Sequence, residues 1–394
     1  MYVILLTYIA HAKEMMTYLD CNASSPIEPE VLDLVVHWLA RPGNAASRTH
    51  EYGVEAQRAV QTARDQVAAV VKAERNEVIF TSGATEANNL ALLGLHAEGL
   101  RTGRKHVVTT AIEHKAVLEP IRWLEEHGFT ATYVRPDAAG QIRADQVLNA
   151  VQDDTLLVSV MHANNETGVI LPIGAIADGL GGHEAYLHTD AAQGFGKDLP
   201  TLKHPRLDLI SISGHKIYAP QGIGALIARR RQWQRAPLTP LAYGGGHEQG
   251  LRPGTLPVAL IAGLGRAAEM AVRDQEQRRQ CNLRHRVAAQ AALATLGAHY
   301  PFETGATLPH VLSLRIPGVD SEALMLAVRG LAALSNGSAC NSQAYEASHV
   351  LMATGMVEPG LDEMVRLSWC HLTPQIDWET LANIIAALRI ERRP

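Results

Sequence analysis

A lysine lies between a histidine and a tyrosine in the stretch SISGHKIYAPQGIG, residues 211–224. Lys216 follows an apolar, β-branched run and precedes a segment rich in proline and glycine, so we expect it at the mouth of a buried strand. A buried ammonium is costly unless it is paired or gives up its proton. The position therefore indicates either a paired structural lysine or an amine that its surroundings make reactive.

Other side chains with chemical potential follow neighbouring strands. The stretch IFTSGATEANN indicates a strand, a turn and a helix start, where the backbone N–H groups of Gly83 to Thr85 could hold a phosphate. Asp190 ends the strand in HTDAAQ, and Ser213 and His215 precede Lys216. Taken singly, these are ordinary capped turns and a helix N-cap. An anion cradle, a carboxylate and an amine on one rim together indicate a pyridoxal phosphate site, in which the lysine carries the cofactor and the acid holds its ring nitrogen protonated.

The elements that must position these groups alternate along the chain. Seven apolar, β-rich runs alternate with segments of helical periodicity. The runs are residues 77–81, 106–110, 132–134, 156–161, 185–190, 207–213 and 224–229. This pattern predicts an α/β fold with a mainly parallel sheet covered on both faces, whose ligands lie at the carboxyl ends of the strands. After about residue 255 a long helical stretch, three short strand candidates and a terminal helix indicate a smaller α+β domain.

Composition narrows the class of protein. The 394 residues are 47% hydrophobic and carry a net charge of −5, so the chain can bury a large core and has no broad attraction to nucleic acid or to a membrane surface. The four cysteines are widely spaced, which argues against a zinc site or a disulfide framework and for a reducing, cytoplasmic setting. Residues 1–15 have neither the flanks of a signal peptide nor the length of a membrane span, and we expect an N-terminal extension there.

An ordered set of motifs from Met16 onward resembles the NifS/IscS-type cysteine desulfurases, which are pyridoxal phosphate enzymes of fold type I. The motifs are YLDCNASSP, GNAASRTHEYG, FTSGATEANN, EHKAV, MHANNETG, HTDAAQ, SISGHKIYAPQGIG, GGGHEQGLRPGT, SNGSACNS and VRLSW. The resemblance implies a large cofactor-binding domain at 31–260 with a mainly parallel seven-stranded sheet, and a smaller C-terminal domain at 261–394. Residues 16–30 would pack on the small domain.

The resemblance also assigns roles to single residues. It implies that Lys216 binds the cofactor covalently, that Asp190 faces the ring nitrogen, and that His114 stacks on the ring and exchanges protons with substrate and product. The remaining implied cofactor contacts within the subunit are Ala84, Thr85, Asn165, Gln193, Ser213 and His215. The resemblance also implies a homodimer with shared active sites, in which Thr255 reaches the cofactor of the neighbouring subunit. Arg366 is implied to bind the substrate carboxylate together with Asn165, although alone it would read as a surface ion pair.

Cys340, in the loop sequence LSNGSACNSQAYEAS, is the implied sulfur carrier. Its thiolate would take the sulfur of L-cysteine as a persulfide, release L-alanine and pass the sulfur to a protein acceptor. Iron–sulfur cluster assembly, tRNA thiolation and DNA phosphorothioation are the acceptor pathways that the family serves. Cys21 and Cys281 are interpreted as packing thiols, and Cys370 as a packing thiol or a second sulfur relay. His162 is interpreted as structural.

Three departures from the family pattern concern loops: NAAS at 44–47, YEAS at 345–348 and LSWCH after Arg366. They leave the core chemistry in place and bear on loop mobility or on acceptor docking. A selenocysteine lyase or an aminotransferase of the same fold would share Lys216 and Asp190 without needing the loop thiol. A cysteine hydrolase would leave the lysine unexplained, and a non-catalytic sulfur carrier could dispense with it.

Overall fold

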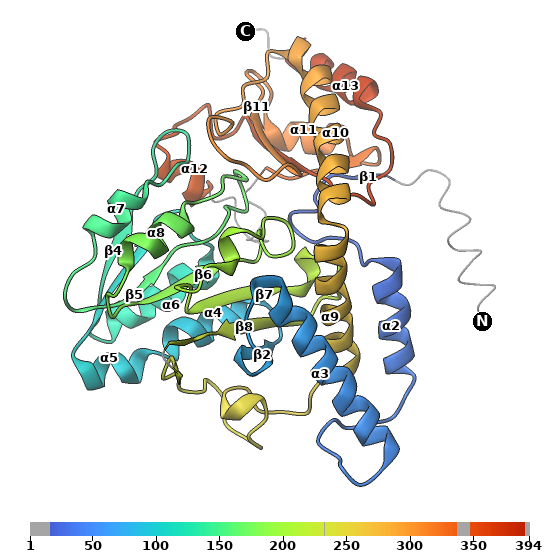
Figure 1. Cartoon of the computed structure of the whole chain (residues 1–394). Coiled ribbons are helices and arrows are strands. Elements are labelled where there is room, and N and C mark those ends of the chain that lie inside the picture. Colours follow the sequence, from blue (N-terminus) through green and yellow to red (C-terminus); the bar gives the residue numbers. More distant parts are fainter. Residues whose placement is uncertain (1–15, 232, 337–346, 391–394) are drawn as a thin grey trace.

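The computed structural model describes residues 16–231, 233–336 and 347–390. Its main sheet has seven strands in the order β2-β8-β7-β6-β5-β3-β4 (Figure 1). Only β8 runs against its neighbours, and the other strand pairs of this sheet are parallel. The strands are β2 Val78–Thr81, β3 His106–Thr110, β4 Thr130–Val134, β5 Thr155–Ser159, β6 Tyr186–Asp190, β7 Leu209–Ser213 and β8 Gly224–Ala228. The expected α/β fold with a mainly parallel sheet is confirmed.

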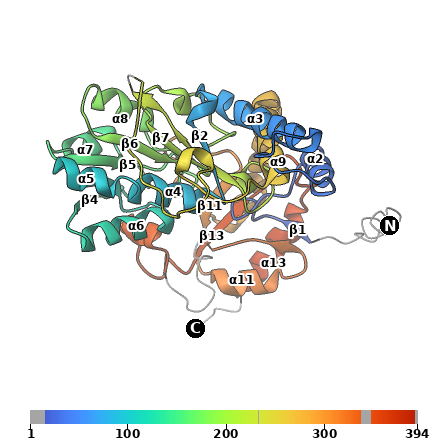
Figure 2. The same ribbon diagram turned by 90° about the horizontal axis from the view of Figure 1, so that it is seen from below.

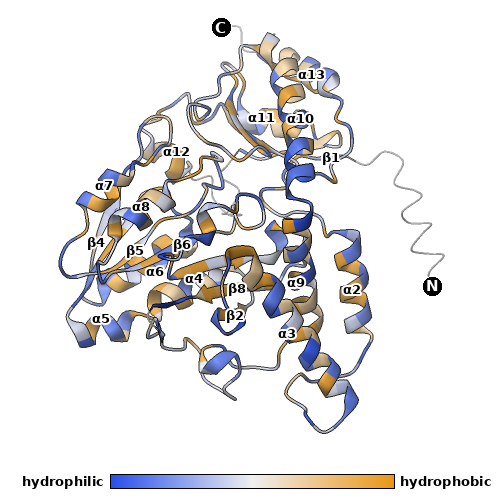
Figure 3. Ribbon diagram, in the orientation of Figure 1, coloured by the Kyte–Doolittle hydropathy of each residue, from blue (hydrophilic) through white to orange (hydrophobic). Residues whose placement is uncertain are grey.

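Helices cover both faces of this sheet because both faces are apolar, and the central strands are coloured accordingly in Figure 3. Along β7, Leu209 packs with the cluster beneath α4 and α6, whereas Ile210 and Ile212 pack with the cluster beneath α3, α8 and α9. The helices around the sheet are α2 Pro29–Leu39, α3 Glu51–Val71, α4 Ala84–Leu93, α5 His96–Thr102, α6 Lys115–Glu126, α7 Ala144–Asn149, α8 Ile173–Leu180 and α9 Val258–Arg273. Figure 2 shows the sheet between these two layers.

A second apolar cluster lies among the C-terminal elements and includes Leu19 from the start of the described chain. It is built on the antiparallel pair β11–β13 and on the parallel pair β1–β12. Its elements are β1 Thr17–Tyr18, α10 Gln275–Leu293, β11 Val311–Arg315, α11 Ser321–Ala327, β12 Ala332–Ala333, β13 Met364–Ser368 and α13 Trp378–Ile390. The short helix α12 His349–Ala353 packs instead with the cluster of the main sheet, through Val350 and Leu351. The chain near residue 20 therefore joins this cluster to the main sheet, a position that matters for the site.

The long helical stretch expected after residue 255 is two helices, because α9 ends at Arg273 and α10 begins after Asp274. α9 packs against α2 and α3 on the main sheet. The domain boundary between residues 260 and 261 falls inside α9 and stays a prediction. No helix in the described part of the chain is long and apolar enough to cross a membrane.

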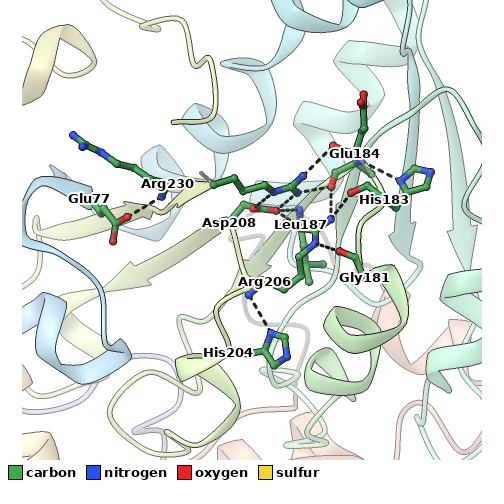
Figure 4. Close-up of polar contacts among 11 residues, drawn as sticks. Glu77, Gly181, His183, Glu184, Leu187, His204, Arg206, Asp208 and Arg230 are labelled. Carbon is green, nitrogen blue, oxygen red and sulfur yellow. Dashed lines mark hydrogen bonds and ion pairs between the residues drawn. The ribbon is translucent and has the colours of Figure 1, made fainter. Parts of the chain in front are cut away.

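A buried carboxylate holds the strands together at the edge opposite the site (Figure 4). Asp208, at the amino end of β7, is 1% exposed and accepts a hydrogen bond from the backbone N–H of Leu187 on β6 at 2.6 Å. Arg206 and Arg231, the latter in the short hairpin β9 Arg230–Arg231 and β10 Gln234–Arg235, form ion pairs with the same carboxylate at 2.5 Å. Because all its oxygens have protein partners, we interpret this cluster as structural.

Candidate active site

A cavity of about 650 Å³ opens at the carboxyl ends of β2, β3, β5, β6 and β7. Ten of the twelve residues predicted for the site line it: Ala84, Thr85, His114, Asn165, Asp190, Gln193, Ser213, His215, Lys216 and Arg366. Thr255 is not part of this lining, and Cys340 lies outside the described residues. The structure thus brings together the residues predicted for the cofactor, while their individual roles remain predictions.

Lys216 is hydrogen-bonded in the structure, and these bonds offset the hydration that its ammonium loses on burial. It ends a short 3₁₀ turn, Gly214–Lys216, directly after β7. Its Nζ donates to the carbonyl oxygens of Asn22 and Ala23, at 2.6 and 2.7 Å. These carbonyls belong to the segment that joins the C-terminal cluster to the sheet. The amine lines the cavity, and both of these hydrogen-bond acceptors are uncharged backbone carbonyls.

Asn22 is a contributor that the sequence interpretation missed. Its carbonyl also accepts a hydrogen bond from Gln193 Nε2 at 3.1 Å, and its own Nδ2 donates to the carbonyl of Asn165. It is 1% exposed, and its Oδ1 and the Oε1 of Gln193 are buried without a protein partner. Buried oxygens of this kind are rare unless a bound group satisfies them. No sequence signal marks Asn22, because its contacts come from parts of the chain more than a hundred residues away.

Asp190 ends β6 as expected, and its two carboxylate oxygens have different partners. Oδ1 accepts from the backbone N–H of Ala192 at 2.9 Å, and Oδ2 accepts from Asn88 Nδ2 at 2.6 Å. Asn88 lies on α4, is fully buried and was also missed from sequence. No local signal distinguishes Asn88, because α4 also carries Thr85, Glu86 and Asn89. Asn88 therefore fixes the orientation of the Asp190 carboxylate.

An anion site is available at the start of α4. Gly83 is the N-cap of this ten-residue helix and supplies no side-chain cap, so the first backbone N–H groups lack the usual side-chain acceptor. Ser213 lies beside Gly83, since its Oγ would be 3.9 Å from a Cβ placed there. Burial, with Lys216 and Lys197 nearby, lowers the pKa of His215 to about 4, so His215 is neutral at neutral pH. The uncapped helix, the two neutral donors and Thr85 fit a phosphate.

His114 has a defined tautomer. It is the N-cap of α6, where its Nδ1 accepts a hydrogen bond from the backbone N–H of Ala116 at 3.0 Å. Burial lowers its pKa, partly offset by Asp190, so the neutral ring carries its proton on Nε2. In this arrangement Nε2 donates. The predicted removal of a thiol proton by His114 would need the cap bond to break first.

Arg366 is a buried residue and not a surface ion pair. It lies in the middle of β13, is 5% exposed, and donates to Asp20 Oδ1 at 2.7 Å and to the carbonyl of Asn165 at 2.9 Å. Its Nε is buried with no protein partner. A guanidinium with one side occupied and another N–H unsatisfied at a cavity wall is suited to bind a carboxylate.

Two buried carboxyl groups support the loops that carry His114 and Asn165. Burial raises the pKa of Glu113 to about 8, and its Oε1 accepts from Thr110 and from the backbone N–H of Met161, both at 2.8 Å. Burial raises the pKa of Glu166 to about 7, where Ser348 donates to it. Both loops are therefore held by hydrogen bonds from other elements.

The comparisons with known proteins agree on one family. A family model for class-V aminotransferases matches residues 17–381. The cysteine desulfurase IscS of Vibrio vulnificus is 40% identical over 385 residues, covering 94% of this chain and 93% of that protein. The crystal structure of DndA from Streptomyces lividans has a TM-score of 0.78 and 44% identity, covering 87% of this chain and 97% of that one. The structure of SspA in complex with cysteine has a TM-score of 0.79 and 34% identity, covering 92% and 100%.

Proposed function

The chain belongs to the class-V aminotransferase family, in its group of pyridoxal phosphate-dependent cysteine desulfurases, and we propose that the cavity beside Lys216 converts L-cysteine to L-alanine and transfers the sulfur to Cys340 as a persulfide. The observation that carries the proposal is the constellation at the carboxyl ends of β2, β6 and β7, where an uncapped helix start, a fixed carboxylate and an amine surround one cavity.

The buried groups of this cavity fit the cofactor. Asp190 would face the pyridine nitrogen and hold its proton, because Asn88 keeps its carboxylate oriented. The start of α4, with Thr85, Ser213 and His215, would bind the phosphate. The unsatisfied Oε1 of Gln193 and the side chain of Asn165 would face the ring's oxygen. What bound pyridoxal phosphate supplies is an electron sink that makes the bonds at the substrate's α-carbon labile.

The chain's own residues would then divide the reaction. Arg366 orients L-cysteine through its carboxylate, since its Nε is free of protein partners. Lys216 carries the cofactor between turnovers and moves the proton of the α-carbon once its amine is released. The Cys340 thiolate attacks the substrate sulfur, taking that atom as the S–C bond breaks, and the remaining three-carbon fragment gains protons to leave as L-alanine. A protein acceptor then removes the outer sulfur from Cys340.

The function is tested by the products. Wild-type protein given L-cysteine and a thiol reductant should release L-alanine and sulfide in equal amounts, both measured in the same samples. The same assay with L-selenocysteine separates the two closest activities. Release of alanine from selenocysteine alone would contradict the proposal and favour a selenocysteine lyase. Formation of pyruvate instead of alanine would indicate a lyase of another kind.

We further propose that the enzyme is a homodimer with shared active sites. Thr255 lies outside the cavity lining of its own chain, in the loop before α9, so a role at a phosphate site requires a second copy. Leu32, Val36 and Leu39 are exposed on one side of α2, and Tyr243 in the same loop as Thr255 is 87% exposed. Apolar side chains gathered in this way favour an interface.

Light scattering should therefore give twice the mass of the 42.6 kDa chain. Thr255→Ala should remain dimeric and lose cofactor about tenfold faster, because one hydrogen bond to a charged phosphate is removed. Release is followed by visible absorbance during dialysis. A fully active monomer, or a Thr255→Ala protein that holds cofactor as tightly as wild type, would contradict the shared site.

We also place the enzyme in the cytoplasm. Three cysteines in the described part of the chain, Cys21, Cys281 and Cys370, are free, and a thiolate nucleophile works in a reducing compartment.

A further inference from the structure

Two cysteines that the sequence treats separately pack against each other. Cys21 is 3% exposed and Cys370 is 1% exposed, and with Tyr218 they form a small cluster of their own. Both sulfurs lie near the hydroxyl of Thr373, which donates to Cys370 Sγ at 3.6 Å and lies 4.0 Å from Cys21 Sγ. Each thiol is also the strongest single influence on the pKa of the other. The pair is therefore a dithiol in contact.

The pKa values of the two thiols are shifted in opposite directions. Hydrogen bonds from Cys21 and Thr373 lower the pKa of Cys370 to about 6, against the effect of burial. The same pairing and burial raise the pKa of Cys21 well above its ordinary value. Cys370 is thus the more acidic thiol of the pair, and Cys21 keeps its proton. A thiolate beside a second thiol combines an attacking sulfur with a resolving one.

The pair is built into the backbone that holds Lys216. Cys21 precedes Asn22, whose carbonyl accepts from Lys216 Nζ and Gln193 Nε2. On the other strand, Ser368 accepts from the backbone N–H of Cys21 at 3.2 Å and, through Oγ, from that of Asn22 at 2.9 Å. Cys370 follows Ser368 by two residues. A backbone movement at Cys21 is therefore passed directly to the carbonyls that hold the lysine.

We propose that Cys21 and Cys370 are an oxidative modification site, at which hydrogen peroxide produces a reversible disulfide that displaces Asn22 and Ala23 from Lys216. A disulfide brings the two sulfurs to about 2.05 Å, closer than any non-bonded contact, and the proposed displacement requires the backbone at Cys21 to follow its side chain. Formation of the disulfide does not depend on the proposed function, whereas its effect on Lys216 rests on that function.

The chemistry balances with peroxide as the two-electron oxidant. The Cys370 thiolate attacks one peroxide oxygen, and the O–O bond breaks. Hydroxide departs, and Cys370 becomes a sulfenic acid. Cys21 Sγ then attacks the Cys370 sulfur, the S–O bond breaks, and the oxygen leaves as water with the Cys21 proton. Access is through the turn at 371–373, where Leu372 is exposed and Thr373 is partly exposed above both sulfurs. A thiol reductant reverses the step.

The test uses the cofactor-loaded Cys340→Ser protein, so that the predicted sulfur carrier does not consume the oxidant. After brief peroxide treatment and removal of excess oxidant, digestion without reductant should give one linked pair of peptides, containing Cys21 and Cys370, lighter by two hydrogens. Dithiothreitol should separate them. The visible spectrum of the bound cofactor should change with linking and recover with reduction.

Matched variants locate the effect. Cys281→Ser, which changes the partly exposed cysteine on α10, should respond like the parent protein. Cys21→Ser and Cys370→Ser should each lose both the linked peptide and the spectral change, and circular dichroism checks that they fold. Added oxygen on Cys370 without a link, or a link to Cys281, would overturn the proposal. A link without a spectral change would overturn the displacement of the lysine. Failure of wild type to form alanine would contradict only the proposed function.

Discussion

Lys216→Ala is expected to lower the turnover of L-cysteine by about 10³-fold or more, because covalent attachment and α-proton transfer are lost together. The visible spectrum of the cofactor should also change, since no amine remains for it to bind covalently. The fold should persist, because the carbonyls of Asn22 and Ala23 that Lys216 satisfies border the cavity, where water can replace the ammonium. The measurements are a spectrum of the purified protein and an alanine assay.

Two controls make this result specific. Lys203→Ala removes a lysine on a 3₁₀ turn that does not line the cavity, and it should leave the spectrum and activity unchanged. Lys216→Arg keeps a positive charge against the same carbonyls but cannot form the covalent link at neutral pH. It should therefore resemble the alanine variant in spectrum and exceed it in stability. A Lys216→Ala protein with the wild-type spectrum would remove Lys216 from the proposed role.

The main sheet could be predicted from sequence because its strands are short apolar runs between helical segments. Residues 106–110 were predicted as a strand and form β3 with the same bounds. What sequence could not show is the order β2-β8-β7-β6-β5-β3-β4, in which β8 is antiparallel and inserted between β2 and β7. The local sequence pattern predicts whether a segment is a helix or a strand, whereas the order of the strands depends on contacts between distant segments.

The site was predictable to the extent that its residues end strands. Asp190, Ser213 and Lys216 follow β6 and β7, so their position at one edge of the sheet follows from parallel topology. Asn22 and Asn88 were missed because their roles are contacts made after folding, with Lys216 and Asp190 respectively. Supporting residues of this kind carry no local signature.

The contact between two cysteines was likewise not predictable from local sequence. Local sequence suggests a packing thiol for Cys21, and it is indeed buried, yet its neighbour is Cys370 from the other end of the chain. The stretch LSWCH, noted as a departure from the family pattern, begins in the last two residues of β13, and the end of that strand places the second thiol there. Burial alone predicts an inert cysteine, whereas a thiolate beside a thiol is chemically different from either residue alone.

Cys340→Ala is expected to separate sulfur transfer from cofactor chemistry. The variant keeps Lys216, Asp190 and the anion site at α4, so it should bind pyridoxal phosphate, remain coloured and show a spectral response to L-cysteine. Alanine release should fall by about 10³-fold or more, as when a covalent nucleophile is removed. Rapid-mixing absorbance should therefore show binding of L-cysteine, and an assay of alanine should show almost no product.

The persulfide gives the complementary measurement. Wild type incubated with L-cysteine should gain one sulfur atom on the peptide that contains Cys340, removed by a thiol reductant, whereas Cys281→Ala should gain it equally because that cysteine lies on α10, away from the cavity. Cys370→Ser is the informative variant, since the pKa of Cys370 is lowered and this thiol would compete for sulfur if it were a relay. Wild-type turnover by Cys340→Ala, or sulfur found first on Cys370, would move the sulfur carrier from the SNGSAC loop to the buried pair.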